Sequence, residues 1–238
     1  MMTEDDADAF AGKLAGATKR CVKDYGDLEV RHEESFSDQL CGRLKETLEG
    51  FATAHIDWQT DIARPGTGRA RLSATTLTKI KEEPLFGADI VMVLDVQTPN
   101  YSVRKGFLVQ AKRLEPGGTM PTAEYGRLLN QCARMISITP SSMVFLYHSG
   151  GVKVVPAAAV LALNSRRLFD IVSYEIDILY RDFAICWYGD TRLQAADQTS
   201  LEGLRTLVDA ESAVAFRGRA RKEVLSGGPR PKRRQLDL

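Results

Sequence analysis

The sequence predicts an α/β protein in which helices flank one mixed β-sheet. One observation is an amphipathic helix in the first quarter of the chain. Another is a pair of short, apolar segments, "GADIVMVLDV" (87–96) and "KGFLVQAKRL" (105–114), which read as strands buried in a core. A further helix and strand follow them. The order helix, strands, helix, strand is typical of helices packed on a mixed sheet.

The elements before these two strands follow from spacing and turn residues. The first 27 residues are acidic and then mixed, and weak periodicity over 7–20 is compatible with a helix. A clear helix follows, because apolar residues recur every three or four positions, which makes one stripe: Phe36, Leu40, Leu44, Leu48 and Phe51. Strands are expected at 55–60 and 69–80, separated by the turn-like "ARPGTG".

The elements after the two strands are read in the same way. A helix follows the break "EPGGTMP", with an inner face made of Tyr125, Leu129, Cys132 and Ile136. Strands are expected at 142–148 and at "VKVVP", and a helix at 157–164. The region 168–215 is read as a mixed segment with a short strand around "DFAICWYG". A final helix is expected from about 200 to 216.

Composition excludes several classes of protein. The chain has 238 residues, enough for one sizeable domain, and no apolar run approaches the roughly 20 residues of a membrane helix. The N-terminus carries acids where a signal peptide needs basic residues, so a cytoplasmic protein is expected. The four cysteines form no CxxC pair. Buried free thiols are therefore favoured over zinc ligands or disulfides.

The C-terminal segment from Arg217 is strongly basic. It holds eight Lys/Arg and two acids, a net charge of +6, whereas the whole chain carries +1. Its mixture of Arg, Lys, Gly and Pro cannot build a core. Residues 217–238 are therefore expected to be a disordered tail, either simply solvated or in contact with a phosphate backbone.

Polar residues stand in the two buried strands, where they need an explanation. Gln110 and Lys112 lie two apart and so project from the same face of their strand. If the strands pair as an antiparallel hairpin, Asp89 approaches Gln110. Burying a carboxylate and an ammonium is costly unless each has a partner. A structural salt bridge between Asp89 and Lys112 would provide one, and so would a metal ion held by the acid.

The first clear helix supplies another acid. Glu33 precedes Phe36 by three residues, which puts it on the apolar stripe, one turn from the helix start. The helix dipole explains an acid at this end but does not explain why it faces inward. Glu34 falls on a different line, which is expected to face solvent together with Asp38, Cys41 and Lys45. Separate elements thus direct carboxylates, an amide and a lysine toward one region.

In this order of elements and residues, the chain resembles the restriction-endonuclease-like superfamily, the PD-(D/E)XK nucleases. The matches are Glu33 in "EESFSDQL", Asp89 in "FGADIVMV" and Gln110-Ala111-Lys112 in "LVQAKR". The (Glu/Gln)-x-Lys strand is of the Gln type found in small prokaryotic families linked to restriction or phage defence. The resemblance covers 33 to about 150. It implies a single nuclease domain at 28–216, after a partly ordered acidic segment at 1–27.

The resemblance implies metal-dependent hydrolysis of DNA, with Mg²⁺ or Mn²⁺ as the cofactor. Asp89 would be the principal ligand, with the Gln110 side chain, the Ala111 carbonyl and Glu33. Lys112 would orient the attacking water and stabilise charge on the phosphate. Gln131 stands where a helical Gln supports the site. Gln110 departs from the acid of many active members, and a neutral amide is a weaker ligand for a hard cation.

Two functions of different classes follow. The first is a metal-dependent endonuclease in prokaryotic defence or repair, with RNA as an open alternative to DNA. The second is a catalytically silent module of the same fold that binds nucleic acid or a protein partner. Intact Glu33, Asp89 and Lys112 favour the first, and Gln110 favours the second. Since no separate recognition domain is visible, a homodimer or an ATPase partner is also compatible with the sequence, and a membrane partner is not expected.

Overall fold

A computed structural model describes residues 4–27, 33–51, 56–59, 67–77, 88–98 and 101–220. The helices within these ranges are α1 (Glu4–Asp27), α2 (Glu33–Phe51), α3 (Thr122–Ile138), α4 (Ala157–Leu163), α5 (Ile176–Ala184) and α6 (Gln198–Leu207), with a 3-10 turn at Leu168–Asp170. The strands are β1 (Ile56–Gln59), β2 (Thr67–Leu77), β3 (Ala88–Thr98), β4 (Tyr101–Arg113), β5 (Ser142–His148), β6 (Gly151–Pro156), β7 (Tyr174–Glu175) and β8 (Ala210–Ala220). The α/β class expected from the sequence is confirmed.

The strands form one mixed sheet in the order β1-β2-β8-β3-β4-β5-β6-β7. Strands β3 and β4 are an antiparallel hairpin, while β8 runs parallel to β3 and β5 runs parallel to β4. Parallel neighbours need long crossover connections, and helices provide them here. The connection from β4 to β5 contains α3, and the chain returns to β8 through α6.

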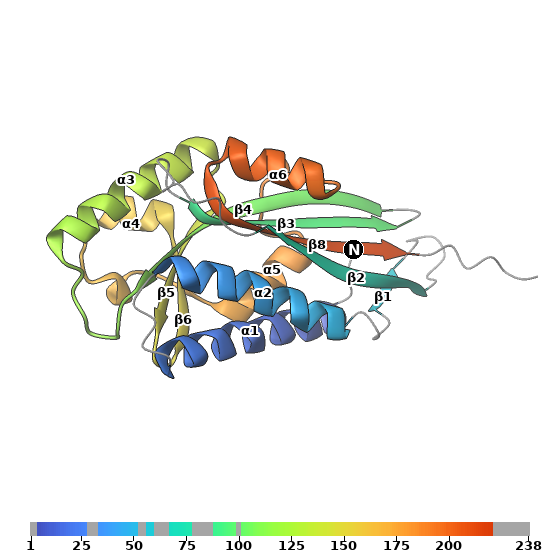
Figure 1. Ribbon diagram of the computed structural model, residues 1–238, viewed down its shortest axis with the longest axis horizontal. Helices are drawn as coiled ribbons and strands as arrows, with labels where there is room; N and C mark the ends of the chain where they lie inside the picture. The colour runs from blue at the N-terminus through green and yellow to red at the C-terminus, as the bar shows by residue number, and fades with distance from the viewer. Residues whose placement is uncertain are drawn as a thin grey trace, which may run out of the picture.

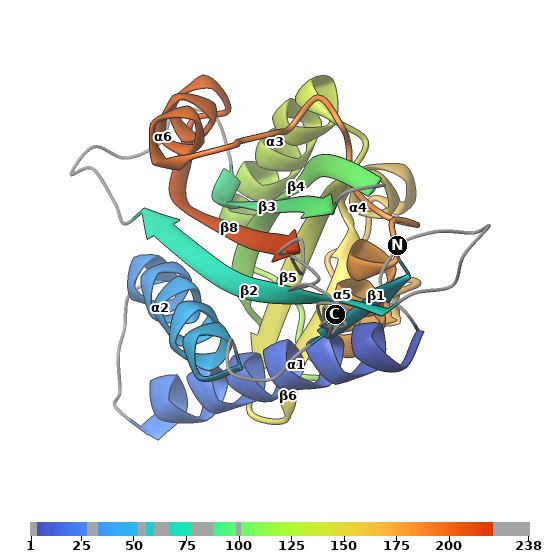
Figure 2. The same ribbon diagram turned by 90° about the vertical axis from the view of Figure 1, so that its right-hand side faces the viewer.

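Helices cover both faces of the sheet (Figures 1 and 2). One apolar core lies under α1, α2 and α5, and includes Ile90 and Met92 of β3 and Phe107 and Val109 of β4. The other lies under α3, α4 and α6, and includes residues of the same strands that point the opposite way, such as Val91, Val93 and Leu108. Strand residues alternate between the faces. Central strands buried on both sides therefore read as continuous apolar runs.

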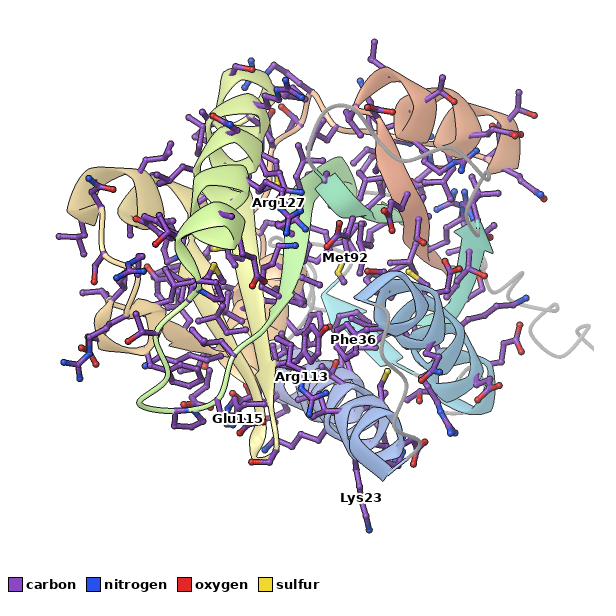
Figure 3. All side chains as sticks on the ribbon, turned by 60° about the vertical axis from the view of Figure 1, so that its left-hand side comes forward. Lys23, Phe36, Met92, Arg113, Glu115 and Arg127 are labelled. Atoms are coloured by element: carbon purple, nitrogen blue, oxygen red, sulfur yellow. The ribbon has the colours of Figure 1, made fainter. Side chains whose placement is uncertain are left out.

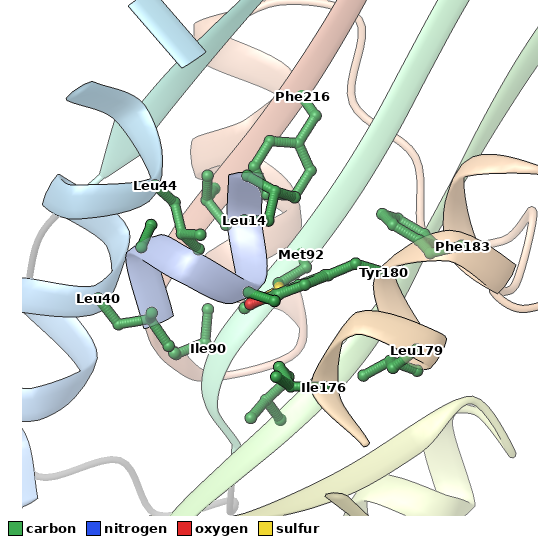
Figure 4. Packing of buried hydrophobic residues seen from close by; sticks show 14 of the residues in the cluster. Leu14, Leu40, Leu44, Ile90, Met92, Ile176, Leu179, Tyr180, Phe183 and Phe216 are labelled. Carbon is green, nitrogen blue, oxygen red and sulfur yellow. The ribbon is translucent and has the colours of Figure 1, made fainter. Parts of the chain in front are cut away.

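The first helix is an integral part of the fold. Phe10 and Leu14 of α1 are fully buried in the core with α2 and α5, and Leu14 lies beside Leu44 and Phe216 in Figure 4. Thr18 and Tyr180 of α5 share a buried hydrogen bond of 3.1 Å. The expected helix at 7–20 is therefore longer, and α1 shares a core with α2 and α5.

The chain after α6 differs from the expectation. A single helix was expected at 200–216, but α6 ends at Leu207 and β8 occupies the centre of the sheet, between β2 and β3. Asp209, with φ of 50°, adopts the left-handed conformation between the two elements, which ends the helix. Because β8 continues to Ala220, the segment from 217 begins as a strand, and the rest of the basic tail lies outside the described residues.

Two smaller expectations are corrected. The segment "DFAICWYG" is not a strand, because α5 runs through Ala184 and irregular turns follow it. Cys41 does not face solvent, because α1 packs against α2 and buries it. Asp38 is half-buried and accepts a hydrogen bond of 2.5 Å from Ser212.

The remaining strands and helices lie close to their expected positions. The expected strands at 142–148 and 152–156 and the helix at 157–164 are confirmed as β5, β6 and α4.

All four cysteines are free, and burial raises the pKa of Cys21 to about 12. Among the described helices, none combines the length and the apolar character that crossing a membrane requires.

Candidate active site at the end of strands β3 and β4

The hairpin brings Asp89 and Gln110 together, as the pattern in the sequence predicts. The β3–β4 ladder pairs Ile90 with Val109, and one step further along it Asp89 lies opposite Gln110. From Leu108 onward β4 pairs with β5 on its other side. Near Gln110, β4 therefore stops pairing with β3 and continues to pair with β5. The polar residues stand at this point, where β3 and β4 separate.

The Asp89 carboxylate takes the place of ladder hydrogen bonds at this point. Its Oδ2 atom accepts the backbone N–H of Ala111 at 2.6 Å and the side-chain N–H of Gln110 at 2.6 Å. Asp89 is 8% exposed and Gln110 is 1% exposed. A buried carboxylate requires such donors, because an unpaired one would cost several kcal/mol.

Gln110 is left with an unpaired oxygen. A carboxylate only accepts hydrogen bonds, so the Gln110 amide must present its NH₂ group to Asp89 and direct Oε1 elsewhere. This Oε1 is buried and has no hydrogen-bond donor among the described residues. A buried acceptor without a donor is uncommon in folded proteins, and it is often explained by an ion or a water molecule.

Lys112 projects from the same side of β4 as Gln110 and is 7% exposed. On this face it lies close to α3, where burial raises the pKa of the Cys132 thiol to about 12 and the Lys112 charge opposes the rise. Arg113 follows on β4, and Arg127 extends from α3; both guanidinium groups are exposed (Figure 3). The site thus combines a buried amine with exposed cations on the elements beside it.

Gln131 lies on α3 next to Cys132. Its Oε1 is also buried without a hydrogen-bond partner among the described residues. Because Lys112 affects the neighbouring Cys132, Gln131 occupies the turn of α3 that passes Lys112. This position is compatible with the supporting role that the sequence suggests.

Glu33 is the first residue of α2, and its side chain lies outside the described residues. Described contacts show where this end of the helix lies. Phe36, one turn later, stacks on Tyr147 of β5 with ring centroids 4.3 Å apart, and Tyr147 pairs with Arg113. The helix covers the face of the sheet opposite to Lys112, but it begins at the end of the sheet that carries the site.

The oxygen atoms of this cluster have the chemistry of ligands for a hard cation. Carboxylate, amide and backbone carbonyl oxygens are what Mg²⁺ and Ca²⁺ bind, and Asp89, Gln110 and Ala111 offer one of each type. Within the described ranges, no three His, Cys, Asp or Glu side chains lie together closely enough to hold a metal ion. A cation here would therefore depend on the amide and carbonyl oxygens in addition to Asp89. Glu33 is the further acid that the sequence analysis names as a ligand.

The sequence reasoning missed a second buried acid. Asp95 of β3 is fully buried, six residues after Asp89 and on the same face. The signal was the same one that singled out Asp89, an acid inside an apolar strand, here in "VMVLDV". Asp95 is paired with arginines of β4 and β8, and the partner strand β8 was not expected.

Comparisons of the chain with protein-family models, with curated proteins and with solved structures found no match.

Proposed function

We propose that the protein is a metal-dependent endonuclease with a restriction-endonuclease-like core, which hydrolyses DNA in prokaryotic defence or repair in the cytoplasm. The observation that carries the proposal is the cluster at the end of β3 and β4. There Asp89 and Gln110 are in contact, the Gln110 oxygen has no described donor, and Lys112 projects from the same side of β4. RNA remains an alternative substrate, because this chemistry does not require a particular sugar.

The order of elements supports the proposed core. The chain runs through α2, the β3–β4 hairpin, α3 and β5, the order of the superfamily that the sequence resembles. Asp89 stands on the first strand of the hairpin and Gln110-x-Lys112 on the second. The C-terminal third, which the resemblance does not cover, supplies β8 between β2 and β3.

In this proposal Asp89, the Gln110 side-chain oxygen and the Ala111 carbonyl hold Mg²⁺ or Mn²⁺, with Glu33 as a further ligand. When bound, the cation would neutralise phosphate charge and lower the pKa of a water molecule. Lys112 would hold the attacking water in line and stabilise negative charge that develops on the phosphate oxygens. The Ala111 N–H and the Gln110 NH₂ fix the orientation of the Asp89 carboxylate.

A second candidate is a catalytically silent module of this fold that binds nucleic acid or a protein partner. It is favoured by the saturation of Asp89 Oδ2, which already accepts two hydrogen bonds at 2.6 Å, as a structural carboxylate would. In this alternative Gln110 replaces a catalytic acid, and the cluster only closes the end of the hairpin.

Cleavage of supercoiled plasmid separates the two candidates. Wild-type protein with Mg²⁺ or Mn²⁺ is expected to nick or linearise the plasmid, whereas Asp89→Ala and Lys112→Met are expected not to. Single-stranded DNA and RNA substrates are included to identify the nucleic acid. If wild-type protein and Asp89→Ala give the same background on every substrate, the silent module is the better account.

A further inference from the structure

A cluster of arginines lies on the same face of the sheet as Gln110 and Lys112, but at the other end of β3. We call Asp95, Arg104, Arg217 and Arg219 the arginine cluster. Asp95 is six residues from Asp89 along β3, so the two acids are about 20 Å apart. The cluster stands near the arrowhead of β8 in Figure 1.

Two of the arginines saturate the buried acid. Arg104 donates from Nε to Oδ1 of Asp95 at 3.1 Å, and Arg219 donates from Nη2 to Oδ2. Arg219 also donates from Nη1 to the Asp95 carbonyl at 3.0 Å. Asp95 is fully buried, so these pairs explain how its charge is tolerated. Both oxygens of this carboxylate are therefore occupied by Arg104 and Arg219.

Within the arginine cluster, Arg217 is the guanidinium that has no ion-pair partner among the described residues. Its Nη1 donates to the Thr75 hydroxyl of β2, but its Nε and Nη2 are buried and have no acceptor in the described part of the chain. Burial lowers the pKa of Arg217 below its ordinary value, and the nearby Asp95 charge opposes this effect. Buried donors without acceptors lower the stability of the fold, and an anion bound to this guanidinium would supply the missing acceptors.

The local charge points in the same direction. Three guanidinium groups lie around one buried carboxylate, and among the described residues the charge of one further acid, Asp197, the N-cap of α6, also acts on Arg217. The Asp197 side chain already accepts the Ser200 N–H at 2.8 Å. Even with Asp197 counted, the described side chains of this region carry one positive charge in excess. The side chains of Arg104 and Arg219 are 33% and 40% exposed, so an anion can reach the cluster from solvent.

We propose that the arginine cluster binds a phosphate group, with Arg217 as the principal ligand and Arg104 and Arg219 beside it. Guanidinium groups bind phosphate through paired, charge-assisted hydrogen bonds, which suits a site with several planar donors. The phosphate would belong either to a nucleic-acid backbone or to a free phosphate compound. If the proposed nuclease function holds, one duplex can serve both sites, since about 20 Å corresponds to about six base pairs.

The test uses full-length protein in EDTA, so that binding is measured without cleavage. Binding of a short labelled DNA duplex is followed by fluorescence anisotropy at several salt concentrations, and binding of inorganic phosphate by calorimetry. The variants are Arg217→Gln and Arg217→Lys. Arg43→Gln is the matched control, because Arg43 lies on α2 over the opposite face and pairs with Asp24 at 2.5 Å.

Arg217→Gln is expected to weaken duplex binding about tenfold and to lower the slope of log K against log salt by about one unit. Arg217→Lys is expected to keep the slope and lose part of the affinity, because it retains the charge without the planar donors. Arg43→Gln is expected to match the wild type. Phosphate binding that requires Arg217, without any effect on the duplex, would identify a free phosphate compound as the ligand.

Unchanged binding of both duplex and phosphate by a folded Arg217→Gln protein would overturn the proposal. Arg104→Gln provides a second variant, because Asp95 keeps its pair with Arg219; it is expected to weaken binding in the same direction. A protein that never cleaves but needs Arg217 to bind would contradict the nuclease and support the phosphate site.

Discussion

The side-chain amide of Gln110 donates from Nε2 to Oδ2 of Asp89 at 2.6 Å, where strands β3 and β4 separate. This contact accounts for both residues in an apolar part of the sheet. It also defines the question about function, because a neutral amide can either support a metal-binding carboxylate or merely satisfy a structural one.

Changing Gln110 to Glu tests whether the site accepts a cation. Two carboxylates would then face each other where the amide now donates, and without metal their repulsion is expected to destabilise the fold by roughly 2–4 kcal/mol. Divalent metal is expected to recover this loss by mass action. Denaturant unfolding in EDTA and in Mg²⁺ measures both effects. Gln110→Met is the control, because it removes the hydrogen bond without adding charge and should not respond to metal.

The variant Lys112→Met distinguishes a catalytic role of Lys112 from a role as the ion-pair partner of a buried carboxylate. If the lysine acts on the reacting phosphate, Lys112→Met is expected to abolish cleavage while the protein unfolds at nearly the wild-type denaturant concentration. If it serves only as the partner of a buried carboxylate, its loss is expected to cost roughly 3–5 kcal/mol, because an uncompensated charge remains. Urea unfolding and plasmid cleavage are measured on the same preparation. A large loss of stability would assign Lys112 to the structure.

The positions of Asp89, Gln110 and Lys112 relative to one another could be predicted from the sequence more completely than the fold around them. Gln110 and Lys112 share a face because of strand alternation, and Asp89 meets Gln110 because consecutive strands form a hairpin, so local rules are sufficient. Glu33 depends on how α2 is placed against the sheet. That is a long-range packing relation, which spacing within the helix does not determine.

Strand β8 shows why the rest could not be predicted. Its partners, β2 and β3, lie more than a hundred residues earlier in the chain. Its Ala, Ser and Glu residues continue the helical pattern of α6 without an obvious break. The missed signal was the alternation of Ser212, Val214 and Phe216 with small residues, together with Asp209 as a residue that tolerates positive φ. Cys41 was misplaced for a related reason, since its burial requires α1 as a partner.

Leu14 tests whether α1 is part of the same cooperative unit. The side chain is fully buried, so Leu14→Ala is expected to lower the free energy of unfolding by about 2–5 kcal/mol through lost contacts and a cavity. Lys13→Ala on the same helix is exposed and is expected to change it by less than about 0.5 kcal/mol. Urea unfolding provides the comparison. Similar small effects for both variants would show that α1 is peripheral.

Lys105 produces a dependence of stability on pH. Burial lowers the pKa of this lysine to about 8, although its Nζ donates to the Tyr188 carbonyl and lies 4.9 Å from the Phe183 ring centroid. Between pH 8 and about 10.4, the unfolded chain binds the proton that the folded protein has released. The contribution of Lys105 to stability therefore rises with pH across this interval.

Comparison of wild type with Lys105→Met isolates this effect from other titrating groups. The difference in unfolding free energy is expected to shift in favour of the wild type by on the order of 3 kcal/mol between pH 7.5 and 10.5. It is measured by urea unfolding at several pH values. A difference that stays constant with pH would show that the ammonium is charged equally in both states.

Thermal melting of wild type and Asp89→Asn over a Mg²⁺ titration tests the central claim most directly. The amide introduced by Asp89→Asn keeps an oxygen to accept the Ala111 N–H, so we expect this variant to be as stable as the wild type in EDTA, within about 1 kcal/mol. Wild-type Tm is expected to rise with Mg²⁺, because only the folded state binds it, and Asp89→Asn is expected not to respond. A wild type indifferent to metal, together with an Asp89→Asn protein that melts far lower in EDTA, would instead mean that Asp89 is a structural carboxylate closing the end of the hairpin.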